Sequence, residues 1–261
     1  MSVAALIFDV DGTIADTEEA HRRAFNEAFA RHGLDWNWTK PRYAELLLTS
    51  GGKERIAAYV EGLRLDPAQR DALVRRIPEI HRTKTGNFAA MVGGGSVPLR
   101  EGVARLFDEA EHAGVRLAIA STTTFANIAA LIDGNLGAGA LGRFAAIGAG
   151  DQVERKKPAS DVYELVLARL GLPAAACVAI EDSANGLAAA KSAGLFTVVT
   201  PGYWTQGEDF SAADLVLPTL GSAARPLPPR LARLVGGDTL GITQLNAHLA
   251  GARRTALAEG S

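Results

Sequence analysis

Short apolar runs recur along the chain, and each ends abruptly in polar or glycine residues. The clearest runs cover residues 3–10, 115–120, 177–180 and 196–200. A short continuous apolar run of this kind is typical of a strand that is buried on both faces of a parallel sheet. We therefore predict that these runs are strands of one such sheet.

Segments with helical periodicity lie between the apolar runs. They cover residues 103–112, 126–132, 162–170 and 187–193. A glycine follows several of them, where a helix would end, as at Gly171. Strands that alternate with helices indicate a doubly wound α/β domain.

One long stretch interrupts this alternation. From Glu18 to about Met91 the chain has helical periodicity and no convincing strand, and Asp66-Pro67 predicts an N-cap followed by the first turn of a helix. Residues 93–96, Gly-Gly-Gly-Ser, are typical of a flexible return connection. We predict an α/β core of residues 1–16 and 93–261 with a helical domain, residues 17–92, inserted after the first strand. Such an insertion can hinge over the carboxyl ends of the strands, where open α/β sheets bind ligands.

Composition and charge narrow the classes of partner. The 261 residues are 48% hydrophobic and 21% charged, and 27 basic against 29 acidic residues leave a net charge of -2. This balance argues against nucleic acid or an anionic membrane surface as a partner. The single cysteine, Cys177, excludes an intramolecular disulfide framework, and no apolar stretch reaches the length of a membrane span. The N-terminus has no basic region of the signal-peptide type, so we expect a cytoplasmic protein. We also expect a monomer.

The strongest chemical signal is Asp9-Val10-Asp11-Gly12-Thr13, where the first predicted strand ends. Two carboxylates two positions apart can surround one hard cation, or they can divide the roles of nucleophile and acid/base catalyst. A solvated turn is the alternative explanation, since Asp and Gly are common in turns.

Further polar residues lie near the ends of later predicted strands. They are Ser121, Lys157 and the pair Glu181-Asp182. Each has an ordinary structural explanation, such as a helix cap, a surface lysine or an acidic helix start. The strand ends of a parallel sheet converge on one edge, however, so together these residues predict a cation site that faces an anion site. Phosphoryl transfer needs this combination.

In this order the motifs resemble those of the haloacid dehalogenase superfamily over nearly the whole chain. The matching residues are 9–13 (DVDGT), Ser121, Lys157-Pro158 and 181–186 (EDSANG). Residues 187–194 continue the last block as in the phosphoglucomutase and sugar-phosphatase branch.

The resemblance implies a role for each motif residue. Asp9 would be the nucleophile that becomes an aspartyl phosphate, Asp11 the general acid and base, and Ser121 and Lys157 the ligands of the transferring phosphoryl group. The dehalogenase branch lacks the second aspartate, so Asp11 favours phosphate ester chemistry. The physical logic agrees, because a dianionic phosphate repels a carboxylate nucleophile until cations neutralise the charge.

The resemblance also implies a Mg²⁺ cofactor. Asp9, the backbone carbonyl of Asp11 and Asp182 would hold the ion, and Glu181 would support this shell. Asp11 would then give a proton to the leaving alcohol and later take one from water.

The helical insertion resembles the four-helix cap of the superfamily, whose inward loop selects the substrate. Here that loop would be residues 49–55, in which Lys53 and Arg55 follow two glycines. Exposed N–H groups at a helix start and two cations could hold a second phosphate. The alternative is a flexible turn followed by solvated charges. Three further residues are candidate substrate contacts: Glu18 and His21 for sugar hydroxyls, and Lys84 for phosphate, although His21 could be structural and Lys84 solvated.

Four segments look like the Calvin-cycle-associated CbbY group of this superfamily: residues 33–36, 51–56, 81–85 and 201–205. This likeness implies removal of phosphate from xylulose 1,5-bisphosphate, an inhibitor of ribulose-bisphosphate carboxylase. The expected partner is therefore a small phosphorylated sugar.

Two other functions share these motifs. A phosphomutase similar to β-phosphoglucomutase would return the phosphoryl group to another sugar hydroxyl, and the core motifs do not distinguish that fate from hydrolysis. A receiver-like regulatory module also forms an aspartyl phosphate, but the early nucleophile, the second aspartate and the large insertion argue against it.

Overall fold

The computed structural model describes residues 2–259, and the side chains of residues 2–251. The helices within these residues are α1 (Glu18–Arg31), α2 (Lys40–Leu46), α3 (Gly52–Glu61), α4 (Pro67–Val92), α5 (Val103–His112), α6 (Phe125–Leu136), α7 (Asp161–Leu170), α8 (Ala184–Ser192), α9 (Pro229–Val235) and α10 (Ile242–Glu259). The strands are β1 (Ala5–Phe8), β2 (Arg116–Ala120), β3 (Phe144–Gly148), β4 (Cys177–Glu181), β5 (Phe196–Val199) and β6 (Leu215–Val216).

The strands form one parallel sheet in the order β3-β2-β1-β4-β5-β6. β1 lies in the middle, with Ala5 opposite Arg116 of β2 on one side and Cys177 of β4 on the other. From β1 the chain adds β2 and β3 on one side of the sheet, and it then crosses to add β4, β5 and β6 on the other side. Open α/β sheets bind ligands at the carboxyl ends of the two strands that flank such a switch point, here β1 and β4. Asp9 and Asp182 each follow one of these two strands.

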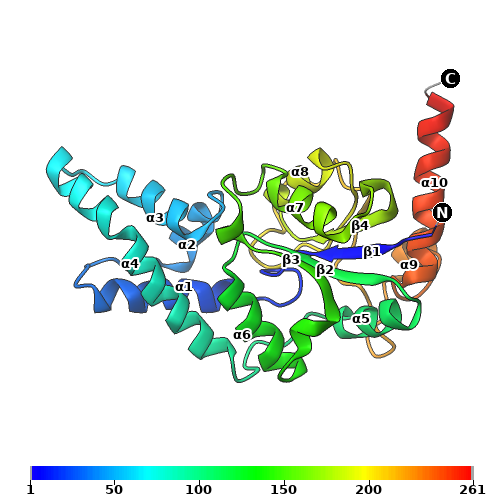
Figure 1. Ribbon diagram of the computed structural model, residues 1–261, viewed down its shortest axis with the longest axis horizontal. Coiled ribbons are helices and arrows are strands. Elements are labelled where there is room, and N and C mark those ends of the chain that lie inside the picture. The colour runs from blue at the N-terminus through cyan, green and yellow to red at the C-terminus, as the bar shows by residue number, and fades with distance from the viewer. Residues whose placement is uncertain (1, 260–261) are drawn as a thin grey trace.

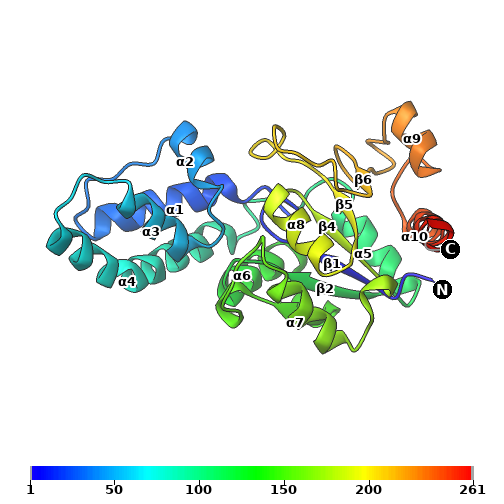
Figure 2. The same ribbon diagram turned by 90° about the horizontal axis from the view of Figure 1, so that it is seen from above.

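Helices cover both faces of the sheet, as the sequence predicts (Figure 1, Figure 2). Leu6 and Phe8 of β1 belong to one buried cluster, which also contains Phe107 of α5 and Leu245 of α10. Ala5 and Ile7 face the other way, into a cluster with α7 and α8 that contains Val162 and Ala190. The alternation within β1 explains its continuous apolar run, because neither face of the strand meets water.

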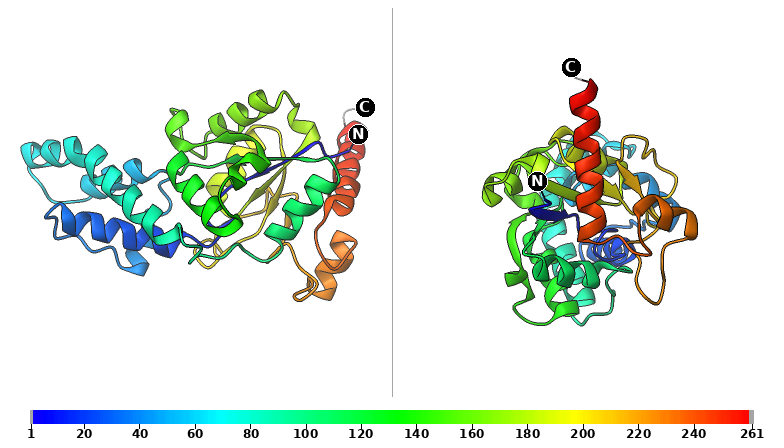
Figure 3. Two further views of the ribbon diagram at one scale, coloured as in Figure 1. Left: turned by 60° about the horizontal axis from the view of Figure 1, so that its bottom comes forward. Right: turned by 90° about the vertical axis from the view of Figure 1, so that its right-hand side faces the viewer.

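The four helices α1–α4 lie between β1 and α5 in the chain and project from one end of the sheet (Figure 1, Figure 3). They have an apolar cluster of their own, which includes Phe25, Phe29 and the fully buried Trp38. Asp66 caps α4 as predicted, with a reciprocal bond to Gln69. We refer to α1–α4 and their connections as the insertion; that it is a separate domain of residues 17–92 stays a prediction.

The predicted elements are present, with some additions. β3 and β6 and helices α9 and α10 were not among the predicted elements, while α5 has the predicted bounds. The polar return connection after α4 is not helical. Within the described residues, no helix has the length and apolar character that a membrane span requires.

Candidate active site

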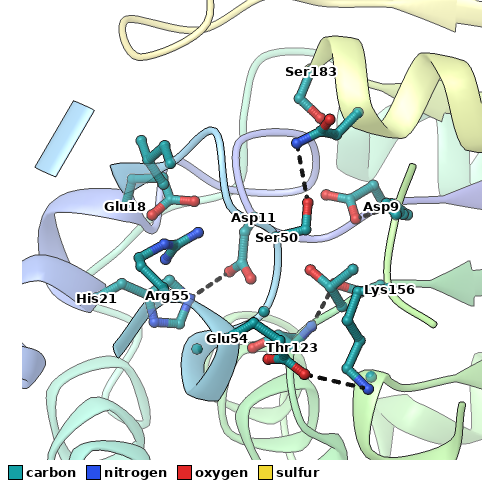
Figure 4. A pocket seen from close by; sticks show the side chains of 18 of the residues that line it. Asp9, Asp11, Glu18, His21, Ser50, Glu54, Arg55, Thr123, Lys156 and Ser183 are labelled. Atoms are coloured by element: carbon teal, nitrogen blue, oxygen red, sulfur yellow. Dashed lines mark hydrogen bonds and ion pairs between the residues drawn. The ribbon is translucent and has the colours of Figure 1, made fainter. Parts of the chain in front are cut away.

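A cavity of about 160 Å³ lies between the carboxyl ends of the strands and the insertion. Figure 4 shows Asp9 on one side of it, His21 and Arg55 on the other, and Asp11 between them. All the side chains that the sequence predicts for the site line this cavity except that of Glu181, which lies behind it. The predicted convergence of the strand ends therefore occurs in the structure.

The loop after β1 is held in a tight turn that presents both aspartates. The Asp9 N–H donates to the Ile180 carbonyl at 3.0 Å and continues the pairing of β1 with β4. Gly12 has a φ of +85°, which favours glycine. A Cβ at this position would lie 2.2 Å from Asp182 Oδ2, so glycine also lets the two loops approach each other.

Lys157 links the nucleophile position to the end of β4. Its Nζ lies 2.6 Å from Asp9 Oδ1 and 2.5 Å from Glu181 Oε1, and its side chain is almost completely buried. Burial alone would lower the pKa of Lys157, but the Asp9 and Glu181 carboxylates raise it above its usual value. Lys157 is therefore a permanent cation beside Asp9.

Three buried carboxylates lie close together here, and Lys157 pairs with two of them. Ligand atoms of Asp9, Glu181 and Asp182 all lie within 4.8 Å of one another. Burial raises the pKa of Asp9 to about 8, and the charges of Glu181 and Asp11 add to this effect while Lys157 opposes it. Burial and the Asp9 charge likewise raise the pKa of Asp182 well above its usual value. If all three carboxylates were ionised, they would carry more negative charge than Lys157 balances, and the raised pKa values of Asp9 and Asp182 reflect this.

Glu181 is engaged by other residues of the protein. Its Oε1 accepts from Lys157 and from the Tyr163 hydroxyl, and its Oε2 accepts from the Asp182 N–H at 3.3 Å. Its geometry suits a group that orients Lys157 and supports the acidic cluster from behind. Sequence reasoning did not identify Tyr163, which lies on α7 in a helical pattern that predicts only core packing.

Asp11 is held by the first helix of the insertion. Its Oδ1 accepts from Thr17 Oγ1 at 2.6 Å and lies 2.8 Å from His21 Nε2. Lys84 Nζ lies 2.6 Å from the other ring nitrogen, His21 Nδ1. When Lys84 is protonated it can only donate, so His21 carries its hydrogen on Nε2 and donates it to Asp11.

This arrangement sets the charge state of all three groups. Burial would raise the pKa of Asp11, but His21 and Thr17 hold it well below its usual range. Burial lowers the pKa of Lys84 to about 7, although Asp11 partly offsets the effect. Burial also lowers the pKa of His21. The contact of His21 with Asp11, the predicted acid/base catalyst, was not predicted from the sequence.

Basic side chains of the insertion form the opposite wall of the cavity. They are Lys53, Arg55, His81 and Lys84. Lys53 is exposed, whereas Arg55 is buried and donates to the Leu46 carbonyl and the Tyr43 hydroxyl, both at 3.1 Å. Burial lowers the pKa of His81 to about 3, and the charges of Lys84, Lys53 and Arg55 act in the same direction.

Glu18 lies at the edge of this wall. Its carboxylate accepts from the Tyr43 hydroxyl at 2.7 Å, and Arg55 donates to the same hydroxyl. Two predicted substrate contacts, Glu18 and Arg55, are thus joined through Tyr43, which sequence reasoning assigned to no role.

Ser121 follows β2 and faces the cavity from the core side. Its N–H donates to the Gly148 carbonyl at 3.0 Å, and its Oγ accepts from the Thr123 N–H at 3.3 Å. Thr124 then caps α6. The bend that results places residues 121–124 along the cavity beside Asp9.

The insertion and the core contact each other across the mouth of the cavity. Asn185, at the start of α8, donates to the Leu48 carbonyl at 3.1 Å and to Ser50 Oγ at 3.2 Å. Lys156 Nζ lies 3.9 Å from Glu54 Oε1 (Figure 4). The block 181–186 contains Asn185, but the sequence alone did not link it to the insertion.

A family model of the haloacid dehalogenase-like hydrolases matches residues 3–194. The chain belongs to this family. The protein CbbY of Rhodobacter capsulatus is 52% identical over 231 residues, which cover 88% of this chain and 100% of that protein. A plasmid-encoded protein CbbY of Cupriavidus necator is 53% identical over 224 residues, which cover 86% of this chain and 88% of that protein.

Solved structures give the same grouping. The crystal structure of CbbY from Rhodobacter sphaeroides in complex with phosphate has a TM-score of 0.79 at 48% identity, covering 85% of this chain and 98% of that chain. A mutant of the same protein, in complex with xylulose 1,5-bisphosphate, matches with the same TM-score of 0.79. β-Phosphoglucomutase from Clostridium difficile, with a TM-score of 0.64 at 20% identity, shares the fold. These matches confirm three sequence predictions: the family, the α/β fold, and the class of enzyme, which is a phosphatase among these hydrolases.

Proposed function

We propose that this protein is a Mg²⁺-dependent sugar-phosphate phosphatase that works through an aspartyl phosphate at Asp9 and acts on xylulose 1,5-bisphosphate. One observation carries the proposal: a buried acidic cluster with its single lysine faces a wall of basic side chains across a cavity of about 160 Å³. The CbbY structures with phosphate and with xylulose 1,5-bisphosphate support this substrate class.

The acidic cluster fits a hard divalent cation. It offers only carboxylate oxygens, and three ionised carboxylates would need more positive charge than Lys157 supplies. Asp9, Asp182 and the Asp11 carbonyl would hold Mg²⁺, with Glu181 behind them. When bound, the ion would supply positive charge that lowers the repulsion between the carboxylate and the phosphate.

The residues of the chain would then act in two steps. An Asp9 carboxylate oxygen attacks phosphorus, and the bond between phosphorus and the sugar oxygen breaks while protonated Asp11 gives its proton to that oxygen. In the second step Asp11 takes a proton from water, whose oxygen attacks phosphorus, so that inorganic phosphate leaves and Asp9 is restored. Lys157 and Ser121 bind the oxygens of the transferring group.

The contacts of Asp11 indicate which of these steps the described conformation serves. Bonded to Thr17 and His21, Asp11 is held ionised, which suits the base that accepts a proton from water. Its action as an acid requires release from one of these contacts. Helix α1 carries His21, so a movement of the insertion would change the charge state of Asp11.

The basic wall would hold the phosphate that does not react. Lys53 is exposed at the cavity rim, and the positive charges around His81 come from the same side. A second anion placed there would bind both the insertion and the core and thereby favour closure.

The deciding experiment is a screen of phosphate release from mono- and bisphosphorylated sugars with Mg²⁺, run beside an isomerisation assay. We expect release from xylulose 1,5-bisphosphate and no isomer of a sugar monophosphate. Isomerisation without net release would instead support the phosphomutase. Membership of a hydrolase family sets aside the receiver-like module. A role beside ribulose-bisphosphate carboxylase, the cytoplasmic location and the monomeric state stay predictions.

A further inference from the structure

Arg100 lies on the return segment between α4 and α5 and does not line the cavity, yet it contacts loops that do. Its guanidinium donates to the carbonyl of Gly12, to the Thr200 carbonyl at 2.6 Å and to the Pro201 carbonyl at 3.0 Å. Its Nε lies 3.4 Å from Asp16 Oδ1. Only 11% of the side chain is exposed.

The backbone at Arg100 contacts the same loop. Its N–H donates to the Ile14 carbonyl at 2.8 Å, and the neighbouring Leu99 forms an isolated bridge with Ala15. The two segments that connect the insertion to the core are therefore joined at Arg100.

The two loops that Arg100 joins both reach Asp182. Gly12 packs so closely on Asp182 that a Cβ there would lie 2.2 Å from Oδ2. In the loop after β5, Gly202 follows Pro201, and the Gly202 N–H donates to Thr205 Oγ1 at 3.0 Å. The same Thr205 hydroxyl lies 3.4 Å from Asp182 Oδ2.

The same contacts restrain Asp11. The Gly12 N–H donates to the Ala15 carbonyl at 2.8 Å, while Arg100 holds the Gly12 carbonyl. Both peptide groups that flank Gly12 are thus fixed, and one of them contains the Asp11 carbonyl. A planar guanidinium with several fixed donors suits this task, whereas a lysine presents one ammonium group.

We propose that Arg100 is a positioning residue that joins the loop after β1 to the loop after β5 and so holds Asp11 and Asp182 in the geometry that the reaction needs. The kinetic part of this inference rests on the proposed phosphatase function. The structural part, the restraint of two loops, can be measured without any substrate.

The chain offers a matched control in Arg105. Its guanidinium donates to three carbonyls as well, those of Leu220, Gly221 and Leu240, but it lies on α5 against the C-terminal segment. Arg105→Lys therefore reports the general cost of replacing an arginine that binds several carbonyls. Arg100→Lys reports that cost together with the effect on the site.

The test compares both variants by hydrogen–deuterium exchange and by kinetics. We expect Arg100→Lys to exchange faster in peptides that cover residues 10–17 and 200–206, with no such change in Arg105→Lys. We also expect kcat to fall roughly 10- to 100-fold and the Mg²⁺ concentration for half-maximal activity to rise, while KM for the sugar phosphate changes little. The midpoint of thermal unfolding should fall by a similar amount in the two variants.

Unchanged exchange in both loops of Arg100→Lys would overturn the proposal, whatever the activity. If the unmodified protein releases no phosphate with Mg²⁺, the proposed function fails, but the exchange measurement still decides the role of Arg100. If Arg100→Lys does not fold, Thr200→Val takes its place, because it removes a hydroxyl 3.2 Å from Arg100. Faster exchange in residues 10–17 of that variant supports the proposal, and unchanged exchange there overturns it.

Discussion

The side chains of the site depend on one another for their charge. Asp9 is nucleophilic only as a carboxylate, yet burial raises its pKa to about 8 and Lys157 alone does not reverse this. Asp11 is in the opposite situation, because His21 and Thr17 keep it ionised. Two aspartates two positions apart thus favour different protonation states in the described structure, and the first proposed step needs the reverse, an ionised Asp9 and a protonated Asp11.

The first prediction concerns Asp9 itself. Asp9→Asn should lower phosphate release by about 10⁴-fold or more, because an amide does not attack phosphorus. The fold should remain, since the change also removes a buried charge. Thermal unfolding and initial rates measure the two effects, with Asp71→Asn on the exposed side of α4 as a control. Turnover near the normal rate would remove Asp9 from the role of nucleophile.

The second prediction concerns the phosphate that does not react. Lys53→Ala should lower kcat/KM for a sugar bisphosphate roughly 10- to 150-fold, since a charge-assisted contact contributes about 1.5 to 3 kcal/mol. A small aryl phosphate has no second phosphate and should be affected much less. Lys40→Ala, an exposed lysine of the insertion that does not line the cavity, is the control. Equal small losses with both substrates would contradict a second phosphate site at Lys53.

Arg55→Ala is a less direct test of the same idea. Arg55 donates to the Leu46 carbonyl and to the Tyr43 hydroxyl, so its removal takes one hydrogen bond from each of these atoms and leaves space where the buried guanidinium lay. We expect a lower unfolding midpoint as well as a lower rate, and only the difference between the two substrates reports on binding.

At the scale of elements, the predicted strands were those with continuous apolar runs. β6 (Leu215–Val216) has only two residues and gives no such run. β3 (Phe144–Gly148) does give a short one, Phe-Ala-Ala-Ile, but half of it is alanine, which is as common in helices, and it was not assigned from the sequence. The motif residues could be predicted because each follows, or lies near, the end of a strand. Tyr163 and Arg100 could not, because neither belongs to a recognised motif, and only the fold brings them to Glu181 and to the Gly12 carbonyl.

The third prediction belongs to the turn after β1. Gly12→Ala should destabilise the protein, because a left-handed conformation costs about 1–2 kcal/mol for a residue with a Cβ. The added methyl group would also displace Asp182, so Mg²⁺ binding should weaken. Gly33→Ala is the control, since it has a similar positive φ and open space around the Cβ position. Isothermal titration with Mg²⁺ and thermal unfolding measure the two effects; if Gly12→Ala binds the ion as tightly as Gly33→Ala does, the close approach to Asp182 is not required for metal binding.

At the scale of the whole molecule, the acidic cluster links stability to pH. The pKa of Asp9 in the folded protein, about 8, lies above the 3.8 of a free side chain. Such a group contributes stability that is complete below about pH 4 and is lost as the pH rises through about 8. The raised pKa of Asp182 acts in the same direction.

The fourth prediction follows from this linkage. Because Mg²⁺ binds the ionised carboxylates, it should raise the unfolding midpoint more at pH 8 than at pH 6. At each pH the unfolding midpoint with Mg²⁺ is compared with the midpoint in a chelator. The effect on stability of other groups that titrate in this range, such as Lys84, is then the same in both samples and cancels in the difference. Asp9→Asn should reduce the difference between the two pH values. A shift that is equal at pH 6 and pH 8 would show that proton release does not accompany metal binding.

The position of β1 in the middle of the sheet has a consequence for synthesis of the chain. The first partner of Ala5 is Arg116 and the second is Cys177, so both neighbours of the strand that carries Asp9 leave the ribosome long after it. The helices α1–α4 are complete by Val92 and have their own apolar cluster, so they can begin to pack while β1 is still unpaired. Asp9 and Asp182 meet only when β4 has been made, and a nascent chain that ends before this strand cannot assemble the acidic cluster.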